Sequence, residues 1–233
     1  MTQQPSGTRT MDGELRIEIM DLPEDVEAGF ACAANAYGKQ ARDFIWTCMK
    51  PGISYDSDRN ANTVFIKATL PREGQRVIVG MAIWFQLSMV EGRGIRPSDD
   101  IRSSFDLEKL YPNNETEQRY LSQLFRSIVK RRIEVAREKE TSQPPSMFHL
   151  GLCAVDPAYQ RRGIASKLVQ WGLDEAKRRG GLEATTEASS MGRHVYERLG
   201  FRGEGSDIEY QVDSEFISRE RPPNLFMRTG ISQ

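Results

Sequence analysis

The chain has 233 residues, of which 38% are hydrophobic and 28% are charged, with a formal net charge of −1 at pH 7. This composition is ordinary for a globular protein, so it disfavours a disordered or membrane class, and the near-neutral charge gives no overall attraction to nucleic acid or anionic lipid. The length predicts one domain over residues 14–229. Residues 1–13 are polar and predict a disordered tail. We expect a cytoplasmic location with nuclear access possible, and no nucleic-acid or membrane partner.

The first half of the chain predicts one strand, two helices and a β-hairpin. Residues 15–19 alternate apolar and charged side chains, which is typical of a half-buried strand. An early proline and several acidic residues then begin a helix over 26–37, and a second helix is expected over 41–49. Residues 63–69 and 76–85 are rich in β-branched and aromatic side chains around a Pro- and Gly-containing turn, so they predict an antiparallel hairpin.

A helical insertion is expected over about residues 90–145, between the third and fourth strands. Its main helix, over 115–139, repeats apolar residues every three or four positions and predicts one buried stripe. A solvated face explains the basic residues of this helix more simply than phosphate binding. These residues are Arg126, Lys130, Arg131, Arg132 and Arg137. The insertion fits either a lid over an acceptor pocket or a dimer surface.

The last third of the chain predicts alternating strands and helices, with a glycine pair after the longest helix as a C-terminal stop. The expected helices cover 163–179 and 191–199. The expected strands cover 147–155 and 184–188, begin again at 200–201, and continue over 208–212 and 225–227.

Three cysteines and two histidines limit the chemistry. Cys32, Cys48 and Cys153 are an odd number without a CxxC spacing, which argues against a disulfide framework and against a zinc site. With only His149 and His194 besides, metal catalysis is not expected, and we predict no metal.

The segment from Gln160 to Ser166 joins a predicted strand to the helix after it. Gly163 lets the backbone approach a ligand closely, and the free N–H groups of the helix start suit an anion. Arg161 and Arg162 add positive charge, and a row of backbone donors suits a diphosphate better than a single carboxylate. Neither GxGxxG nor a P-loop occurs here, and an ordinary strand-to-helix turn is the alternative interpretation.

Two signatures in this part of the chain resemble the GNAT superfamily of N-acetyltransferases. Residues 160–165, Gln-Arg-Arg-Gly-Ile-Ala, match the Q/R-x-x-G-x-G/A motif and follow the Val-Asp-Pro of 155–157. Residues 195–201, Val-Tyr-Glu-Arg-Leu-Gly-Phe, match the Tyr-x-x-x-Gly-Phe ending. The resemblance covers roughly residues 147–203. Within the family, the chain resembles a fungal-type branch whose acceptors are small molecules or unknown. The N-terminal half agrees only in the order of its elements.

The resemblance implies an α/β fold with a mixed, strongly twisted central sheet flanked by helices. Its fourth and fifth strands would splay apart around acetyl-CoA, whose pantetheine arm meets the fourth strand and whose pyrophosphate meets the turn. Ser189 stands where the family often has an asparagine. The coenzyme-binding residues so implied are Cys153, Ala154, Val155, Gln160, Arg161, Arg162, Gly163, Ile164, Ala165, Ser166, Ser189 and Arg193.

The catalytic expectations also follow from the resemblance, which implies direct transfer. Tyr196 matches the family's tyrosine that protonates the coenzyme sulfur, with a packed aromatic as the alternative. Glu187, near the end of the predicted fifth strand, is the candidate base, with a structural carboxylate as the alternative. His149 is a weaker candidate because it lies further back on its own strand. An acylated Cys153 is disfavoured because buried strand cysteines are usually inert.

The function predicted is therefore an acetyl-CoA-dependent N-acetyltransferase acting on a small-molecule amine, as a monomer or homodimer. A protein N-terminus or lysine is an alternative acceptor, and a non-catalytic acyl-CoA-binding module is an alternative of another class. Nucleic-acid binding through residues 130–132 is disfavoured because acidic residues lie close by. Candidate pocket aromatics are Trp46, Tyr55, Trp84 and Phe85.

Overall fold

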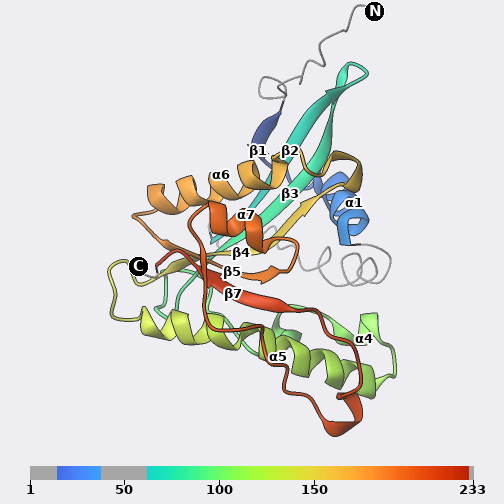
Figure 1. The fold of residues 1–233 in the computed structure, drawn as a ribbon, viewed down its shortest axis with the longest axis vertical. Coiled ribbons are helices and arrows are strands. Elements are labelled where there is room, and N and C mark those ends of the chain that lie inside the picture. Colours follow the sequence, from blue (N-terminus) through green and yellow to red (C-terminus); the bar gives the residue numbers. More distant parts are fainter. Residues whose placement is uncertain (1–14, 38–61, 231–233) are drawn as a thin grey trace, which may run out of the picture.

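The computed structural model describes residues 15–37 and 62–230, which build one seven-stranded mixed sheet flanked by helices (Figure 1). The strand order is β1-β2-β3-β4-β5-β7-β6, and among these strands only β4 and β5 pair in parallel. The strands are β1 (Arg16–Ile19), β2 (Thr63–Arg72), β3 (Gln75–Leu87), β4 (Met147–Val155), β5 (Glu183–Ser189), β6 (Arg202–Gly203) and β7 (Asn224–Arg228). The helices are α1 (Val26–Tyr37), α4 (Leu107–Leu110), α5 (Glu115–Glu138), α6 (Ile164–Arg178) and α7 (Arg193–Arg198). None of these helices is long and apolar enough to cross a membrane.

The predicted fold class is confirmed, including the helical segment between β3 and β4. The strand predicted over 208–212 is wrong. Ile208 donates its N–H to Asn224, but the chain then runs along α5, where the N–H of Gln211 donates to the Ser127 hydroxyl at 3.0 Å instead of extending a ladder. The helix predicted over 41–49, the tail over 1–13 and the side chains of Trp46, Cys48 and Tyr55 lie outside the described residues.

Helices cover the two faces of the sheet in different ways. One face is covered by α6 and α7, and the largest cluster of buried apolar side chains lies there. The other face is shared by α1, which packs against β3 and β4, and α5, which packs against β7. The stripe predicted on α5 is buried at Val129 and Ile133 and half-buried at its other residues, and Val135 and Ala136 outside it are also buried.

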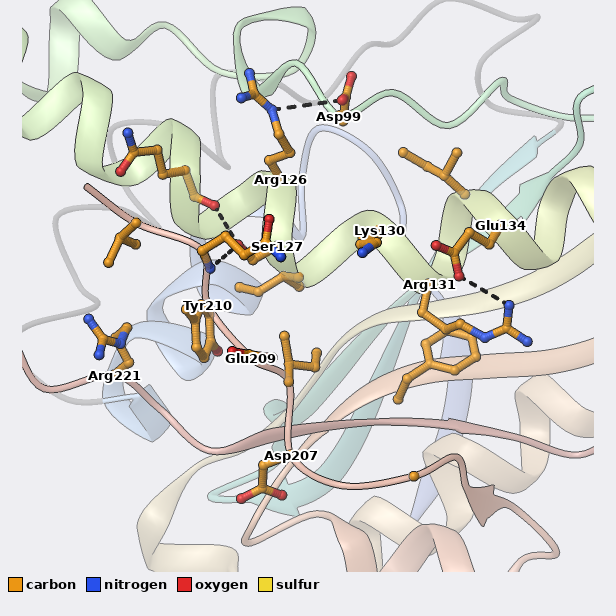
Figure 2. A pocket seen from close by; sticks show the side chains of 18 of the residues that line it. Asp99, Arg126, Ser127, Lys130, Arg131, Glu134, Asp207, Glu209, Tyr210 and Arg221 are labelled. Carbon is orange, nitrogen blue, oxygen red and sulfur yellow. Dashed lines mark hydrogen bonds and ion pairs between the residues drawn. The ribbon is translucent and has the colours of Figure 1, made fainter. Parts of the chain in front are cut away.

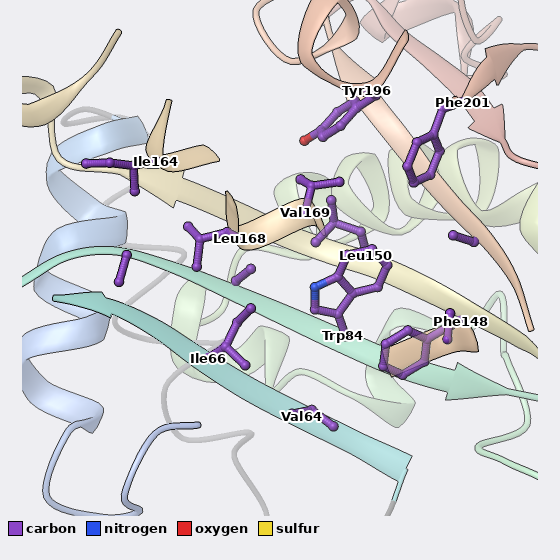
Figure 3. Close-up of a cluster of buried hydrophobic side chains, with 14 of the residues drawn as sticks. Val64, Ile66, Trp84, Phe148, Leu150, Ile164, Leu168, Val169, Tyr196 and Phe201 are labelled. Carbon is purple, nitrogen blue, oxygen red and sulfur yellow. The ribbon is translucent and has the colours of Figure 1, made fainter. Parts of the chain in front are cut away.

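Trp84 lies at the centre of the cluster beneath α6 (Figure 3). Its indole is fully buried and stacks on Phe148, with ring centroids 5.0 Å apart. The indole fits under α6 because the helix has a glycine there: a Cβ on Gly172 would lie 2.1 Å from Trp84 Cζ2. Helix and sheet therefore approach more closely than any side chain at position 172 would permit.

Gly172→Val is expected to lower the free energy of unfolding by about 3 kcal/mol, since overpacking a dense core forces side chains off their rotamers. Urea denaturation followed by tryptophan fluorescence measures the loss. Gln170→Val places the same side chain on an exposed position of α6 and is the matched control. Equal stability of the two variants would contradict this account of the α6 contact.

Candidate functional site

The parallel strands β4 and β5 pair along only part of their lengths. Residues 147–150 of β4 pair with 183–186 of β5, and the Thr186 hydroxyl donates to the Leu150 carbonyl at 3.0 Å where the pairing ends. Beyond that point β4 continues on β3, while β5 continues on β7. Residues 151–155 therefore have a strand partner on one side only, which we call the open edge of β4.

A β-bulge at Gly151 marks the start of the open edge. In the β3–β4 ladder, Ile83 lies opposite Leu152 and Trp84 lies opposite Leu150, so Gly151 has no partner residue. A Cβ there would lie 2.4 Å from Phe85 Cε2, so a side chain would collide with the ring. The extra residue bends the strand and changes the face to which later side chains point.

The direction of the backbone groups along this edge follows from one hydrogen bond. The N–H of Asp156 donates to the Val79 carbonyl on β3 at 3.0 Å. Because neighbouring residues of a strand face opposite sides, the backbone groups of Ala154 also face β3, and those of Cys153 and Val155 face the open edge. The expectation that Ala154 contacts a coenzyme is not supported, since its backbone serves the ladder and its side chain is buried against α1.

Both carbonyls of the open edge accept hydrogen bonds from side chains. The Tyr37 hydroxyl, at the end of α1, donates to the Cys153 carbonyl at 3.4 Å. The Gln160 amide donates to the Val155 carbonyl at 3.0 Å and so ties the following turn to β4. The groups that remain to meet a ligand along this edge are the N–H groups of Cys153 and Val155.

The turn before α6 has the geometry of an anion cradle. Arg161 and Gly163 have φ angles of 61° and 78°, and no side chain caps the helix. The first intrahelical bond is donated by Lys167 to Gly163, so the N–H groups of Ile164, Ala165 and Ser166 have no partner within the helix. A Cβ on Gly163 would meet no atom within 4 Å, so the glycine serves the backbone conformation and leaves open space beside it.

The two arginines of the turn are placed differently. Arg162 donates to the Ala158 carbonyl at 3.2 Å, and its guanidinium lies 5.3 Å from the centre of the Tyr159 ring. Arg161 is exposed beside the helix start. The positive φ of Arg161 followed by that of Gly163 directs successive N–H groups into one concave site, which suits the oxygens of a phosphate.

Tyr196 lies on α7 next to the open edge. It is 8% exposed and packs against Phe201, and Figure 3 shows its hydroxyl directed away from that ring. Burial raises the pKa of Tyr196 well above its usual value, and the nearby Cys153 and Tyr37 raise it further. The phenol is therefore protonated throughout the physiological range and can donate a hydrogen bond.

The Cys153 thiol is buried near Tyr196. Burial, with a smaller effect from Cys32, raises the pKa of its thiol to about 12. Only about one molecule in 10⁵ then carries the thiolate at pH 7, and the thiolate is the nucleophilic form. The two cysteines are both free thiols. The environment therefore opposes a covalent route through Cys153.

Glu187 and His149 lie together on the face covered by α5. The Glu187 carboxylate accepts two hydrogen bonds from Arg132, one of them at 3.0 Å, and lies 3.3 Å from His149 Nε2. Burial alone would raise the pKa of Glu187, but the charge of Arg132 and the contact with His149 outweigh it and lower the pKa to about 2. Burial and Arg132 lower the pKa of His149, whose Nδ1 faces the Thr185 hydroxyl at 3.0 Å.

Two expectations change in the structure, and one is compatible with it. Arg132 does not lie on a solvated face, since it reaches Glu187, and Arg131 pairs with Glu204 at 2.6 Å. Arg193 does not extend towards the turn, because its guanidinium bonds the Pro223 carbonyl and Asp207 in the C-terminal segment. Ser189 is exposed at the end of β5, beyond the point where β4 and β5 separate, so its position is compatible with a coenzyme contact.

Sequence reasoning missed two residues of this site, Tyr37 and Arg132. Tyr37 is the last residue of α1 and meets β4 across 116 positions of sequence. Arg132 meets Glu187 across 55 positions. A charged residue inside the buried stripe of α5 was a usable signal, because an arginine on an apolar helix face needs a carboxylate partner.

Comparisons with known proteins agree with this geometry. The family model described as Acetyltransferase (GNAT) family matches residues 99–201. Arylalkylamine N-acetyltransferase 2 from Aedes aegypti is 17% identical, with a TM-score of 0.57 over 92% of this chain and 97% of that chain. The histone acetyltransferase HPA2 and related acetyltransferase from Corynebacterium glutamicum is 15% identical, with a TM-score of 0.52 over 94% and 98%.

A third solved structure, the polyamine N-acetyltransferase of Drosophila melanogaster, is 13% identical, with a TM-score of 0.50 over 92% of this chain and 97% of that chain. At such identities the likeness shows the fold alone. No curated protein sequence matches the chain. The family match is more informative for the site, because residues 99–201 contain the open edge, the turn, Glu187 and Tyr196.

Proposed function

We propose that the chain is a member of the acetyltransferase (GNAT) family, whose model matches residues 99–201, and that it moves the acetyl group of acetyl-CoA directly to the amine of a small molecule. The observation that carries the proposal is the open edge of β4, which leads into the uncapped start of α6 and has Tyr196 beside it. Family members use acetyl-CoA. The same proposal places the chain in a fungal-type branch of the family that acetylates small molecules.

The open edge supplies what a pantetheine arm requires. An amide carbonyl of the arm accepts a hydrogen bond from the N–H of Val155, much as a neighbouring strand would. The arm then ends with its pyrophosphate at the N–H groups of 164–166, next to Arg161. The N–H of Cys153 also faces the thioester carbonyl, whose oxygen gains negative charge during attack. Ser189 contacts the arm from the opposite strand.

Tyr196 protonates the departing thiolate in this proposal. A phenol with a raised pKa is a poor acid for a thiolate in water. However, the sulfur leaves beside Cys153, where burial raises the pKa of a thiol to about 12. The same burial makes the coenzyme thiolate a stronger base, so the proton affinities of the phenolate and the thiolate approach each other, as efficient proton transfer requires.

Glu187 is the proposed base, with a restricted role. With a pKa of about 2 it does not remove a proton from an alkylammonium, whose pKa resembles the 10.4 or so of lysine. The amine therefore has to arrive neutral. Glu187 then accepts a hydrogen bond from the attacking nitrogen, and it takes the proton of that nitrogen once attack on the thioester has made the nitrogen strongly acidic. Arg132 and His149 fix the position of the carboxylate.

This division of roles predicts the pH dependence. The rise of kcat/KM with pH is expected to follow the ammonium pKa of the acceptor, so two acceptors that differ by about two units shift the rise by the same amount. Because the pKa of Tyr196 is raised, kcat is expected to stay level on the alkaline side up to about pH 10. If kcat/KM rose at the same pH for all acceptors, the rise would instead reflect the titration of a group of the protein.

Restricted access to Glu187 supports a small acceptor. Its side chain is only 7% exposed beneath Arg132 and α5, which suits a slender amine better than a folded polypeptide.

Thiol release from acetyl-CoA by the purified chain tests the proposal, with small amines, peptides with free N-termini and lysine peptides as acceptors. Faster release with small amines supports it, faster release with peptides assigns a protein acceptor, and coenzyme binding without release from any acceptor supports a non-catalytic module.

A further inference from the structure

A large cavity in the described part of the chain lies away from the open edge of β4. It has a volume of about 1970 Å³ and runs along α5, between the segment 96–99 and the C-terminal segment 204–223 (Figure 2). We call it the α5 groove. Its floor is apolar, formed by the core side chains Met89, Ile133 and Phe226. Neither Cys153 nor Tyr196 lines it, so the proposed chemistry does not account for the groove.

The α5 groove is lined by six cationic side chains and six carboxylates, but these groups are unequally paired. Most of its carboxylates pair with arginines: Asp207 lies 2.6 Å from Arg193, and Glu204 lies 2.6 Å from Arg131. Among the described residues, Glu209 is the one groove carboxylate without an ion-pair partner. Four groove cations have no carboxylate partner within residues 15–37 and 62–230. These are Arg96, Lys130, Arg137 and Arg221.

These cations are distributed along the groove. Lys130 and Arg137 lie two turns apart on the exposed side of α5, at the same angular position. Arg96 and Arg221 donate to backbone carbonyls, which fixes the guanidinium groups without neutralising their charge. At one end of the groove Ile217 is 63% exposed, an unusual position for a large apolar side chain.

We propose that the α5 groove binds an acidic, partly apolar peptide segment of a partner protein. The four cations without carboxylate partners match carboxylates of the peptide, and the apolar floor and Ile217 match its apolar side chains. The groove follows α5 from Gln123 to Arg137, a rise of about 21 Å, which accommodates about six residues of extended chain. The proposal is independent of the acetyl-transfer function.

A nucleic acid fits this groove less well. Glu134, Asp207 and Glu209 line it together with the cations, and Figure 2 shows these carboxylates among the groove side chains. Each would repel the continuous row of phosphates that a nucleic acid carries. The apolar floor has no role in phosphate binding. A peptide with separated acidic residues avoids both difficulties.

Fluorescence anisotropy with a labelled eight-residue peptide of alternating Glu and Leu tests the proposal on the full chain. The Kd is expected to rise at least tenfold in the double variant Lys130→Glu/Arg137→Glu, and at least tenfold when Gln replaces Glu in the peptide. Lys109→Glu/Lys177→Glu makes the same charge change at exposed positions outside the groove and is expected to change the Kd less than twofold. Unchanged acetyl-CoA binding in both variants shows that the fold is intact.

Three outcomes would overturn the proposal. The first is the absence of saturable binding of the Glu-Leu peptide at millimolar concentration, or an equal loss in both double variants. The second is binding of an eight-nucleotide thymidine strand as tight as that of the peptide and equally sensitive to Lys130→Glu/Arg137→Glu. The third is a dimer of the chain that this double variant dissociates, because the groove would then hold a second copy.

Discussion

Replacing Tyr196 by Phe is expected to lower kcat about 10²- to 10³-fold, while the Kd for acetyl-CoA changes less than about twofold. The variant keeps the ring that packs on Phe201 and loses only the hydroxyl beside the open edge of β4. Without that hydroxyl the thiolate leaves unprotonated in a buried environment, which is costly. Steady-state kinetics with a saturating amine, together with calorimetric titration of acetyl-CoA, separates the two effects.

Tyr210→Phe is the matched control for this experiment. It removes a hydroxyl that donates to the Pro222 carbonyl at 2.8 Å in the C-terminal segment, at a distance from the open edge. We expect its kcat to remain within about threefold of the unmodified chain. If Tyr196→Phe also retained full turnover, another group would have to protonate the thiolate, and the assignment of Tyr196 would be wrong even with coenzyme binding intact.

Gly163→Asp is expected to raise the Kd for acetyl-CoA about 100-fold or more. Aspartate adopts positive φ more readily than most residues, and the position has open space for a side chain, so the turn should fold. The substitution places a carboxylate where we propose that the pyrophosphate binds. Repulsion between like charges at short range costs several kcal/mol, and about 2.7 kcal/mol corresponds to 100-fold in Kd.

Gly163→Asn distinguishes charge from shape in this prediction. Asparagine has nearly the same size and the same tolerance of positive φ as aspartate, but it is neutral. We expect it to raise the Kd for acetyl-CoA less than about tenfold, and calorimetry at two salt concentrations should show that the difference between the variants shrinks as salt increases. Equal Kd values for Asp and Asn would mean that the pyrophosphate does not bind at this turn.

The parts of the molecule that were predictable from sequence are those with local signals. The alternation in β1, the stripe of α5 and the glycine between β4 and α6 each depend on residues close together in the chain, and all three elements were found in place. The segment 208–212 has an alternating pattern as well, yet it lies along α5 and is not a strand. The N–H of Gln211 donates to Ser127 and the N–H of Asp213, just beyond the segment, donates to Gln123, so the path of the chain depends on a distant helix that no local pattern reveals.

The same reason explains what was missed at the site. The positions of Glu187 and Tyr196 in the chain were predictable, but their surroundings depend on distant residues. The low pKa of Glu187 arises from Arg132 on α5, and the interpretation of that arginine as solvated was wrong because its carboxylate partner lies on another element. The surroundings of Arg193 also depend on distant residues, since Asp207 and Pro223 hold its guanidinium in the C-terminal segment.

The bulge at Gly151 determines from which direction each substrate arrives. In a regular strand His149 and Cys153 would point to the same face, but the extra residue places His149 with Glu187 beneath α5 and Cys153 in the cluster beneath α6. In the proposed reaction the coenzyme therefore approaches from the α6 side and the amine from the α5 side, and they meet in the gap between β4 and β5. Neither substrate blocks the entrance of the other, so a ternary complex can assemble in either order.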